Sequence, residues 1–265
     1  MTESYKDLFR GTAWYYARYR SGYPEAFFKL VRDKFELSKV DRVLDLGCGT
    51  GQIAIPVCRF VREVVAMDPE PEMIAEGKKE AEKSGASNIM WVEGGSDDLP
   101  NMREELGTFK LVAMGNSFHW MNQEKTLEIL YEMIHDGGGI VTVGSASLWT
   151  KANEWQSVVK TTIQKWLGEE RRAGSGVYKP PARRYDEYIA TSRFRRMETW
   201  KCPYAVTTDI DGVIGNLYST SGANPNVLGN KKEAFEKDLR ETLSKLNPSG
   251  KFMSEGEVEA TLAWK

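Results

Sequence analysis

Short apolar segments alternate with amphipathic ones between residues 24 and 145. Glycines or other turn-forming residues bound the apolar segments, as is typical of buried parallel strands, at 43–46, 64–67, 89–92, 111–114 and 140–143. The segments between them have helical spacing of apolar positions, at 24–35, 52–61, 71–83 and 126–135. This alternation predicts a parallel sheet with helices on both faces.

The pattern changes after residue 145. Residues 146–185 contain three tryptophans, Trp149, Trp155 and Trp166, which could form the core of a cap or line a pocket. A strand is expected at 194–202, a helix at 231–246 and an alternating, closing strand at 257–264. We therefore divide the chain into three parts. An N-terminal helical lid segment spans 1–39, and a discontinuous core comprises 40–145, 186–202 and 256–265. Two cap insertions span 146–185 and 203–255.

A glycine-rich turn joins the first predicted strand to the helix that follows, in the string Asp45-Leu46-Gly47-Cys48-Gly49-Thr50-Gly51. Glycines there permit positive φ angles and the close approach of a ligand to the backbone. The start of a helix also offers N–H groups that have no partner within the helix. A dinucleotide fingerprint would need a third glycine at position 52, where the chain has Gln52, which argues against a pyrophosphate-bearing cofactor such as NAD.

The next predicted strand ends in Asp68, 17 residues after Gly51. An acid at this place can accept both ribose hydroxyls of a nucleoside. The alternative is that Asp68 caps a helix that begins at Pro69. With the glycine turn upstream, we favour ribose binding.

Four segments together resemble the motifs of class I S-adenosylmethionine (SAM)-dependent methyltransferases. Residues 43–52 and 64–69 resemble the first two motifs, 95–100 the third and 115–120 the fourth. The resemblance implies an α/β fold: a Rossmann-like, seven-stranded, mostly parallel sheet with helices on both faces, an antiparallel final strand and a cap formed by insertions. It also implies an enzyme with SAM as its cofactor and S-adenosylhomocysteine as its product.

The same resemblance supplies candidate cofactor-binding residues. Met73 sits where the family often packs an apolar residue on the adenine, and an acid of the third motif, or its backbone neighbour, meets the adenine amine. The segment 16–24 and the pair His119-Trp120 are similar to a narrower small-molecule branch, of ubiquinone/menaquinone type and trans-aconitate type. That likeness implies that Tyr16 and Arg20 hold the SAM carboxylate. The remaining candidates are Gly47, Cys48, Gly49, Gln52, Asp68, Pro69, Ser96, Asp97, Asn116 and Phe118.

His119 is the candidate catalytic residue. It follows the carboxyl end of a predicted strand, where α/β enzymes place their ligands, and imidazole suits general-base work near neutral pH. It could instead orient the acceptor by a hydrogen bond, or pack on Trp120 as a structural residue. The second histidine, His135, is interpreted as structural, at the end of a predicted helix. Cys48 is interpreted as a small residue beside the cofactor rather than a nucleophile.

The net charge and the cysteine content restrict the kinds of partner and ligand that we expect for this protein. The net charge of −2 supplies no global positive field for nucleic acid, and no apolar stretch is long enough for a transmembrane helix. Three cysteines without metal-type spacing indicate no metal site and a cytoplasmic protein with reduced thiols. We expect a monomer or homodimer that acts on a small molecule and does not engage a membrane.

Residues 171–201 hold nine basic and three acidic residues, which allows an anionic acceptor or RNA, or simply a solvated face balanced by acids elsewhere. The main alternative function is therefore an RNA or protein methyltransferase that uses this stretch. A non-catalytic SAM-binding protein is a further alternative, and an NAD-dependent oxidoreductase is disfavoured by Gln52.

Overall fold

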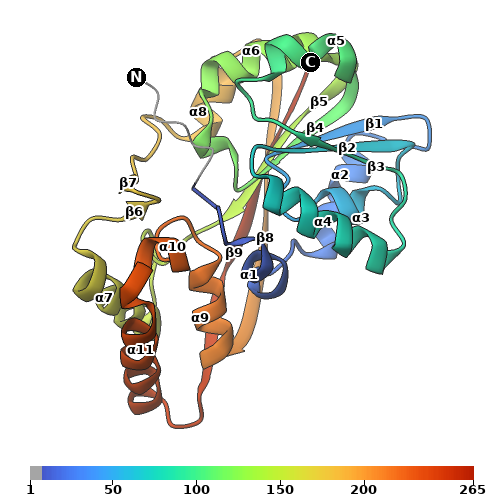
Figure 1. Ribbon diagram of the computed structural model, residues 1–265. Coiled ribbons are helices and arrows are strands. Elements are labelled where there is room, and N and C mark those ends of the chain that lie inside the picture. Colours follow the sequence, from blue (N-terminus) through green and yellow to red (C-terminus); the bar gives the residue numbers. More distant parts are fainter. Residues whose placement is uncertain (1–7) are drawn as a thin grey trace. The chain divides into compact units, whose positions relative to one another are not determined.

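A computed structural model describes residues 8–265 (Figure 1). The chain divides into two compact units, each built from separated stretches. The sheet unit comprises Gly22–Gly144, Pro180–Cys202 and Val258–Lys265. The helical unit comprises Ser145–Lys179, Pro203–Glu257 and, at the N-terminus, the described residues 8–21.

A seven-stranded sheet has the strand order β3-β2-β1-β4-β5-β9-β8. Parallel ladders join β1 to β2 and β4, β2 to β3, and β4 to β5. The final strands are antiparallel, so the predicted Rossmann-like, seven-stranded, mostly parallel sheet is confirmed. The strands are β1 (Arg42–Leu46), β2 (Glu63–Asp68), β3 (Ile89–Glu93), β4 (Phe109–Gly115), β5 (Ile134–Ser145), β8 (Arg196–Asp209) and β9 (Lys251–Trp264).

Helices pack against the sheet strands, with α4 on β2 and β3 and α5 and α8 both against α6 (Figure 1). Leu44 and Val65 of the strands share one buried cluster with Leu106, Leu130 and Ile189 of the helices α5, α6 and α8. Side chains on the other face of the strands, such as Val43 and Val64, are buried as well. The helices of this unit are α2 (Glu25–Lys34), α3 (Ala54–Val57), α4 (Pro71–Ser84), α5 (Leu99–Leu106), α6 (Gln123–Met133) and α8 (Tyr185–Ala190), with a 3₁₀ turn η2 (Phe118–Trp120).

Two predicted helices have different bounds in the structure. The helix expected over 52–61 is reduced to α3, which begins only at Ala54 because Pro56 has no N–H to bond back to the preceding turn. The helix expected over 126–135 begins at Gln123, since the Asn122 side chain caps it by accepting the Lys125 N–H at 3.1 Å, and it ends at Met133. The placement of His135 at a helix end was therefore wrong, and His135 is an exposed residue of β5.

The helical unit has an apolar core of its own. Phe235, Leu239 and Leu243 lie on one face of α11 and are fully buried with residues of α7 and α9, as their spacing predicts. Trp149, Trp155 and Trp166 pack against this cluster. The elements are α1 (Ala13–Tyr19), α7 (Glu154–Leu167), β6 (Arg172–Ala173), β7 (Gly176–Val177), α9 (Ile210–Tyr218), α10 (Pro225–Leu228), η3 (Gly229–Lys231) and α11 (Lys232–Leu246).

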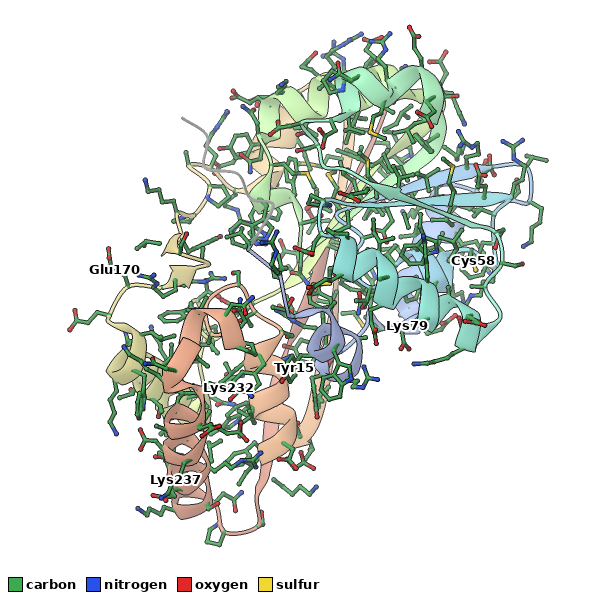
Figure 2. All side chains as sticks on the ribbon, viewed as in Figure 1. Tyr15, Cys58, Lys79, Glu170, Lys232 and Lys237 are labelled. Atoms are coloured by element: carbon green, nitrogen blue, oxygen red, sulfur yellow. The ribbon has the colours of Figure 1, made fainter. Side chains whose placement is uncertain are left out.

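Helix α1 belongs to the helical unit, whereas α2 belongs to the sheet unit. Tyr15 of α1, labelled in Figure 2, meets Tyr218 of α9 edge to face, with 5.2 Å between the ring centroids. Within residues 8–265, no helix combines the length and the apolar character that crossing a membrane requires.

Candidate functional site

The glycine turn after β1 is fixed by the neighbouring strands. The N–H groups of Gly47 and Cys48 both donate to the carbonyl of Met67 in β2, at 2.8 and 3.0 Å. Gly47 has a φ of 75°, and a Cβ atom added to it would lie 2.4 Å from the Cβ of Ser117. Only glycine therefore fits this turn without strain, which keeps the backbone open to a ligand.

Asp45 supports the same turn from inside the sheet. Its Oδ2 accepts the Ala54 N–H at 2.9 Å, and the residue is 1% exposed. Burial, and to a lesser degree the charge of Asp68, raises the pKa of the Asp45 carboxyl to about 7. The sequence analysis did not single out this residue, although a lone acid inside an apolar strand was the available signal.

The carboxylate of Asp68 lies against the glycine turn. Its Oδ2 accepts the Gly49 N–H at 2.8 Å, and its Oδ1 accepts the Glu70 N–H at 3.0 Å. The N-cap of the helix α4 is Glu70, whose side chain accepts the Glu72 N–H, so Asp68 does not cap this helix. Burial raises the pKa of the Asp68 carboxyl to about 6, because it disfavours the charged form more than the two backbone N–H groups favour it.

The segment after β3 approaches the segment after β2. A Cβ atom added to Gly95 would lie 3.8 Å from the Cβ of Pro69. Of the predicted residues here, Ser96 is half-buried and Asp97 is exposed. Asp98, which was not predicted, closes this turn by accepting the Gly95 N–H at 2.8 Å.

The other candidate residues of the first two motifs are buried or half-buried. Met73 is 2% exposed, and Cys48 is buried, which raises the pKa of its thiol well above the ordinary value. This supports the interpretation of Cys48 as a packing residue rather than a nucleophile. The half-buried side chain of Gln52 donates to the Thr50 hydroxyl at 2.7 Å.

The carboxyl end of β4 contributes the fourth motif. Asn116 has a φ of 51°, and its Nδ2 donates to the Tyr23 hydroxyl at 3.2 Å. The Ser117 hydroxyl donates to the carbonyl of Leu46 at 2.7 Å, which ties the end of β4 to the end of β1. Phe118 is fully buried in the core of the sheet unit, so its side chain serves packing. Tyr23 was missed as a site residue, although it lies in the segment 16–24 that resembles the small-molecule branch.

His119 lies in η2, directly after this segment, and its ring contacts two other side chains. Its Nδ1 is 2.9 Å from the hydroxyl oxygen of Tyr185, the first residue of α8. Its ring lies 4.6 Å from the ring of Trp120, centroid to centroid. Tyr185 was also missed, since it is 66 positions away in the chain.

Tyr16 and Arg20 lie together in the helical unit. The Arg20 guanidinium is 5.1 Å from the centre of the Tyr16 ring, and its Nε donates to the Ser219 hydroxyl at 2.8 Å. The structure thus brings these two candidates to each other, and it brings Asp68 to Gly49 in the sheet unit.

The basic residues of the segment 180–202 are largely matched by acids. Arg184 pairs with Asp186 at 3.1 Å and Lys201 with Glu259 at 3.0 Å. Three further pairs are Arg183 with Glu124, Arg193 with Glu132, and Arg196 with Glu198. This agrees with a solvated face balanced by acids. Among residues 8–265, no group of three His, Cys, Asp or Glu side chains is placed to hold a metal ion.

Comparisons with known proteins agree with this geometry. A family described as a methyltransferase domain matches residues 43–138. A Saccharomyces cerevisiae protein named as a SAM-dependent methyltransferase is 26% identical over 47% of this chain, and the match spans only 42% of that protein. A Dictyostelium discoideum protein named as a methyltransferase is 22% identical over 91% of this chain and 86% of its own length.

Solved structures show the same fold. A structure from Anaeromyxobacter dehalogenans, titled as a type II methyltransferase, has a TM-score of 0.58 at 18% identity and covers 92% of this chain and 95% of its own. A methyltransferase structure from Bacillus halodurans has a TM-score of 0.55 at 17% identity, with coverages of 91% and 99%.

Proposed function

The chain carries a class I SAM-dependent methyltransferase domain, and from this premise we propose that it transfers the methyl group of SAM to an O, N or C atom of a small-molecule acceptor. The observation that carries the proposal is the contact between the Asp68 carboxylate and the glycine turn at Gly49. This contact lies at the carboxyl ends of β1 and β2, beside the place where the strand order reverses between β1 and β4. Sheets of this kind bind their ligands at such a reversal.

The residues present fit the cofactor. Gly47 and Gly49 have positive φ angles, and because they carry no side chain a nucleoside can approach their backbone closely. Asp68 supplies a carboxylate that can accept ribose hydroxyls, and Pro69 and Met73 supply the apolar surroundings that an adenine needs. We assign the adenine amine to the turn at Ser96 and Asp97. Tyr16 and Arg20 stay the residues that the family resemblance predicts for the SAM carboxylate.

Bound SAM supplies a methyl group that its sulfonium has already activated. The protein has to align the acceptor with that methyl group and exclude water, and alignment alone can lower the barrier by roughly 7–11 kcal/mol. We assign the acceptor to His119. The imidazole either removes a proton from the acceptor or orients the acceptor by donating a hydrogen bond. The first role needs the ring nitrogen that faces the acceptor to be unprotonated, and the second needs that nitrogen to carry the proton.

The ion pairs of the segment 180–202 support a small acceptor. Each pair cancels a positive charge that would otherwise attract a polyanion, so this face offers RNA few unmatched cations. The three cysteines are free thiols, which supports our placing the reaction in the cytoplasm.

A screen of metabolite classes for SAM-dependent methyl transfer tests the proposal, with S-adenosylhomocysteine formation as the readout. RNA and protein substrates enter the same screen. Methylation of a small molecule, together with no RNA binding at low salt, is the expected result. Tight, steeply salt-dependent RNA binding with methylation of RNA alone would overturn it.

A further inference from the structure

Trp91 of β3 lies against two glycines from different parts of the sheet unit. Gly51 is the last residue of the glycine turn after β1, and Gly77 lies inside α4. A Cβ atom added to Gly51 would be 3.0 Å from Cη2 of Trp91, and one added to Gly77 would be 2.5 Å from both Cη2 and Cζ3. The outer edge of the indole therefore occupies the space that a side chain at either glycine would need.

The glycine turn, α4 and the indole meet at one point. A Cβ atom added to Gly77 would also be 3.4 Å from the carbonyl carbon of Thr50, which belongs to the turn. Both Gly51 and Gly77 are buried, and Trp91 is half-buried. The backbone of Trp91 is held in the sheet by its pairing with Ala66 of β2, and α4 packs on both strands (Figure 1). The ring thus reaches the turn from a rigid support.

Helix propensity does not explain a glycine at position 77. Alanine is the best helix former and glycine among the poorest, and Gly77 lies in the interior of a 14-residue helix. The indole does explain it, because any side chain at this position would have to displace the ring of Trp91. Since Thr50 and Gly51 border the same space, we expect a displaced indole to press on the glycine turn.

The same contact joins the two ends of the nucleoside site that we assign. Met73 lies one helical turn before Gly77 on the same face of α4 and is buried, so the indole supports both the glycine turn and the helix that carries Met73. Glycines give the turn backbone freedom that a bound ligand must remove at a cost in entropy. A rigid ring against the turn removes part of this freedom before the cofactor binds.

We propose that Trp91 is a positioning residue for the cofactor, which holds the glycine turn and α4 at a fixed separation, and that Gly77 is the small residue that admits its ring. This proposal rests on the placement of SAM at the glycine turn in the proposed function. It does not depend on the identity of the acceptor.

A double-mutant cycle on the full chain tests the proposal. Calorimetric titration measures the dissociation constant for SAM in Gly77→Ala, in Trp91→Phe and in the double variant, and urea unfolding shows that each is folded. In the unaltered protein, Gly77→Ala should raise this constant at least about ten-fold, a coupling that residues in contact commonly show. In Trp91→Phe, the same substitution should raise it less than about three-fold, because phenylalanine lacks the second ring that carries Cη2 and Cζ3.

Trp200→Phe is the matched control for the aromatic exchange. Trp200 is also half-buried, and it lies in β8, at the opposite edge of the same sheet, with its ring 6.4 Å from that of Phe27 between centroids. Trp91→Phe should raise the dissociation constant for SAM about three- to ten-fold, because the turn must then be ordered when the cofactor binds. Trp200→Phe should leave that constant unchanged.

The indole N–H resonances supply a readout that a merely structural role would not move. The chain has eight tryptophans, and Trp91→Phe and Trp200→Phe each assign one signal. Titration of the unaltered protein with S-adenosylhomocysteine should shift the signal of Trp91, whose ring touches the turn, and leave that of Trp200 in place.

An equal effect of Gly77→Ala on SAM affinity in the two backgrounds, or an unmoved Trp91 signal in protein that binds the ligand, overturns the proposal and leaves methyl transfer untouched. Should Gly77→Ala not fold, the aromatic pair decides, and equal SAM affinities of Trp91→Phe and Trp200→Phe overturn the proposal. Conversely, the expected coupling without methylation of any small molecule would support the role of Trp91 and defeat the proposed function.

Discussion

The Asp68 carboxylate accepts the backbone N–H of Gly49, with 2.8 Å between Oδ2 and N. This bond joins the acid at the end of β2 to the glycine turn after β1. The two strands are in parallel register, with Leu46 beside Met67, so the ladder itself delivers the acid to the turn. The geometry proposed for the cofactor is thus held by the protein alone and costs little reorganisation on binding.

Removing this carboxylate should weaken cofactor binding. In Asp68→Ala, we expect the dissociation constant for SAM to rise about 10–100-fold, because the charge-assisted hydrogen bonds to the ribose are lost. Calorimetric titration with SAM, S-adenosylhomocysteine and NAD measures this, and NAD should not bind either protein. The matched control is Asp136→Ala, which removes an exposed acid of β5 that has no place in the candidate site. Equal effects of the two substitutions would argue against ribose binding by Asp68.

Asp45 should make the protein less stable as the pH rises. Because its folded pKa of about 7 is above its ordinary value of 3.8, the protonated form favours folding, and this stability is lost between about pH 4 and pH 7. The loss is at most about 4 kcal/mol. In Asp45→Asn, the amide oxygen can still accept the Ala54 N–H but the side chain no longer ionises. Urea unfolding measures the free energy of unfolding at pH 5 and at pH 8. This free energy should fall less between the two pH values in the variant than in the unaltered protein, and equal falls would contradict the prediction.

A pair of glycine substitutions separates crowding from backbone strain. Gly47→Ala places a methyl group against Ser117 at a φ of 75°, whereas Gly85→Ala has a φ of 71° and nothing within 4 Å of the added Cβ. We expect Gly85→Ala to cost about 1–2 kcal/mol of unfolding free energy, and Gly47→Ala about 1–3 kcal/mol more. Chemical denaturation measures both costs. Gly47→Ala should also reduce SAM binding. If the two substitutions lower the free energy of unfolding equally, the Ser117 side chain moves away from the added methyl group without cost.

His119→Ala should separate acceptor chemistry from cofactor binding. Because the contacts of His119 with Tyr185 and Trp120 lie outside the residues assigned to the ribose, SAM affinity should stay within a few-fold of its original value. Methyl transfer to the acceptor found by screening should fall about 10²-fold, the cost of misplacing an oriented reactant. The exposed His135→Ala is the control and should turn over normally. Undiminished turnover in His119→Ala would reject the assignment of this residue to the acceptor.

The parallel strands were predictable because each is a short apolar run closed by turn residues. The outer halves of β8 and β9 were not, since only segments 194–202 and 257–264 were expected. Much of the outer part of β8 is exposed, so its sequence lacks the alternation that burial imposes on one face. Pairing between the two strands, rather than a buried face, sustains them there.

The glycine turn and Asp68 were accessible to sequence reasoning, because strand, turn and acid follow one another at fixed spacing. The choice between ribose binding and helix capping was not, since it depends on the helix starting at Pro71 rather than Pro69. Tyr23 and Tyr185 were out of reach for a different reason. They meet Asn116 and His119 only through the folded sheet unit, and the segment 16–24 that contains Tyr23 was interpreted for Tyr16 and Arg20 alone.

The strand order has a consequence for how the protein is made. β5 lies beside β9, which comes from residues 251–264, so this edge of the parallel strands remains without its neighbour until those residues have left the ribosome. An unpaired edge of this kind invites pairing with other chains. The nascent protein therefore has an aggregation-sensitive interval after β5 is made, which closes when β9 adds to the sheet.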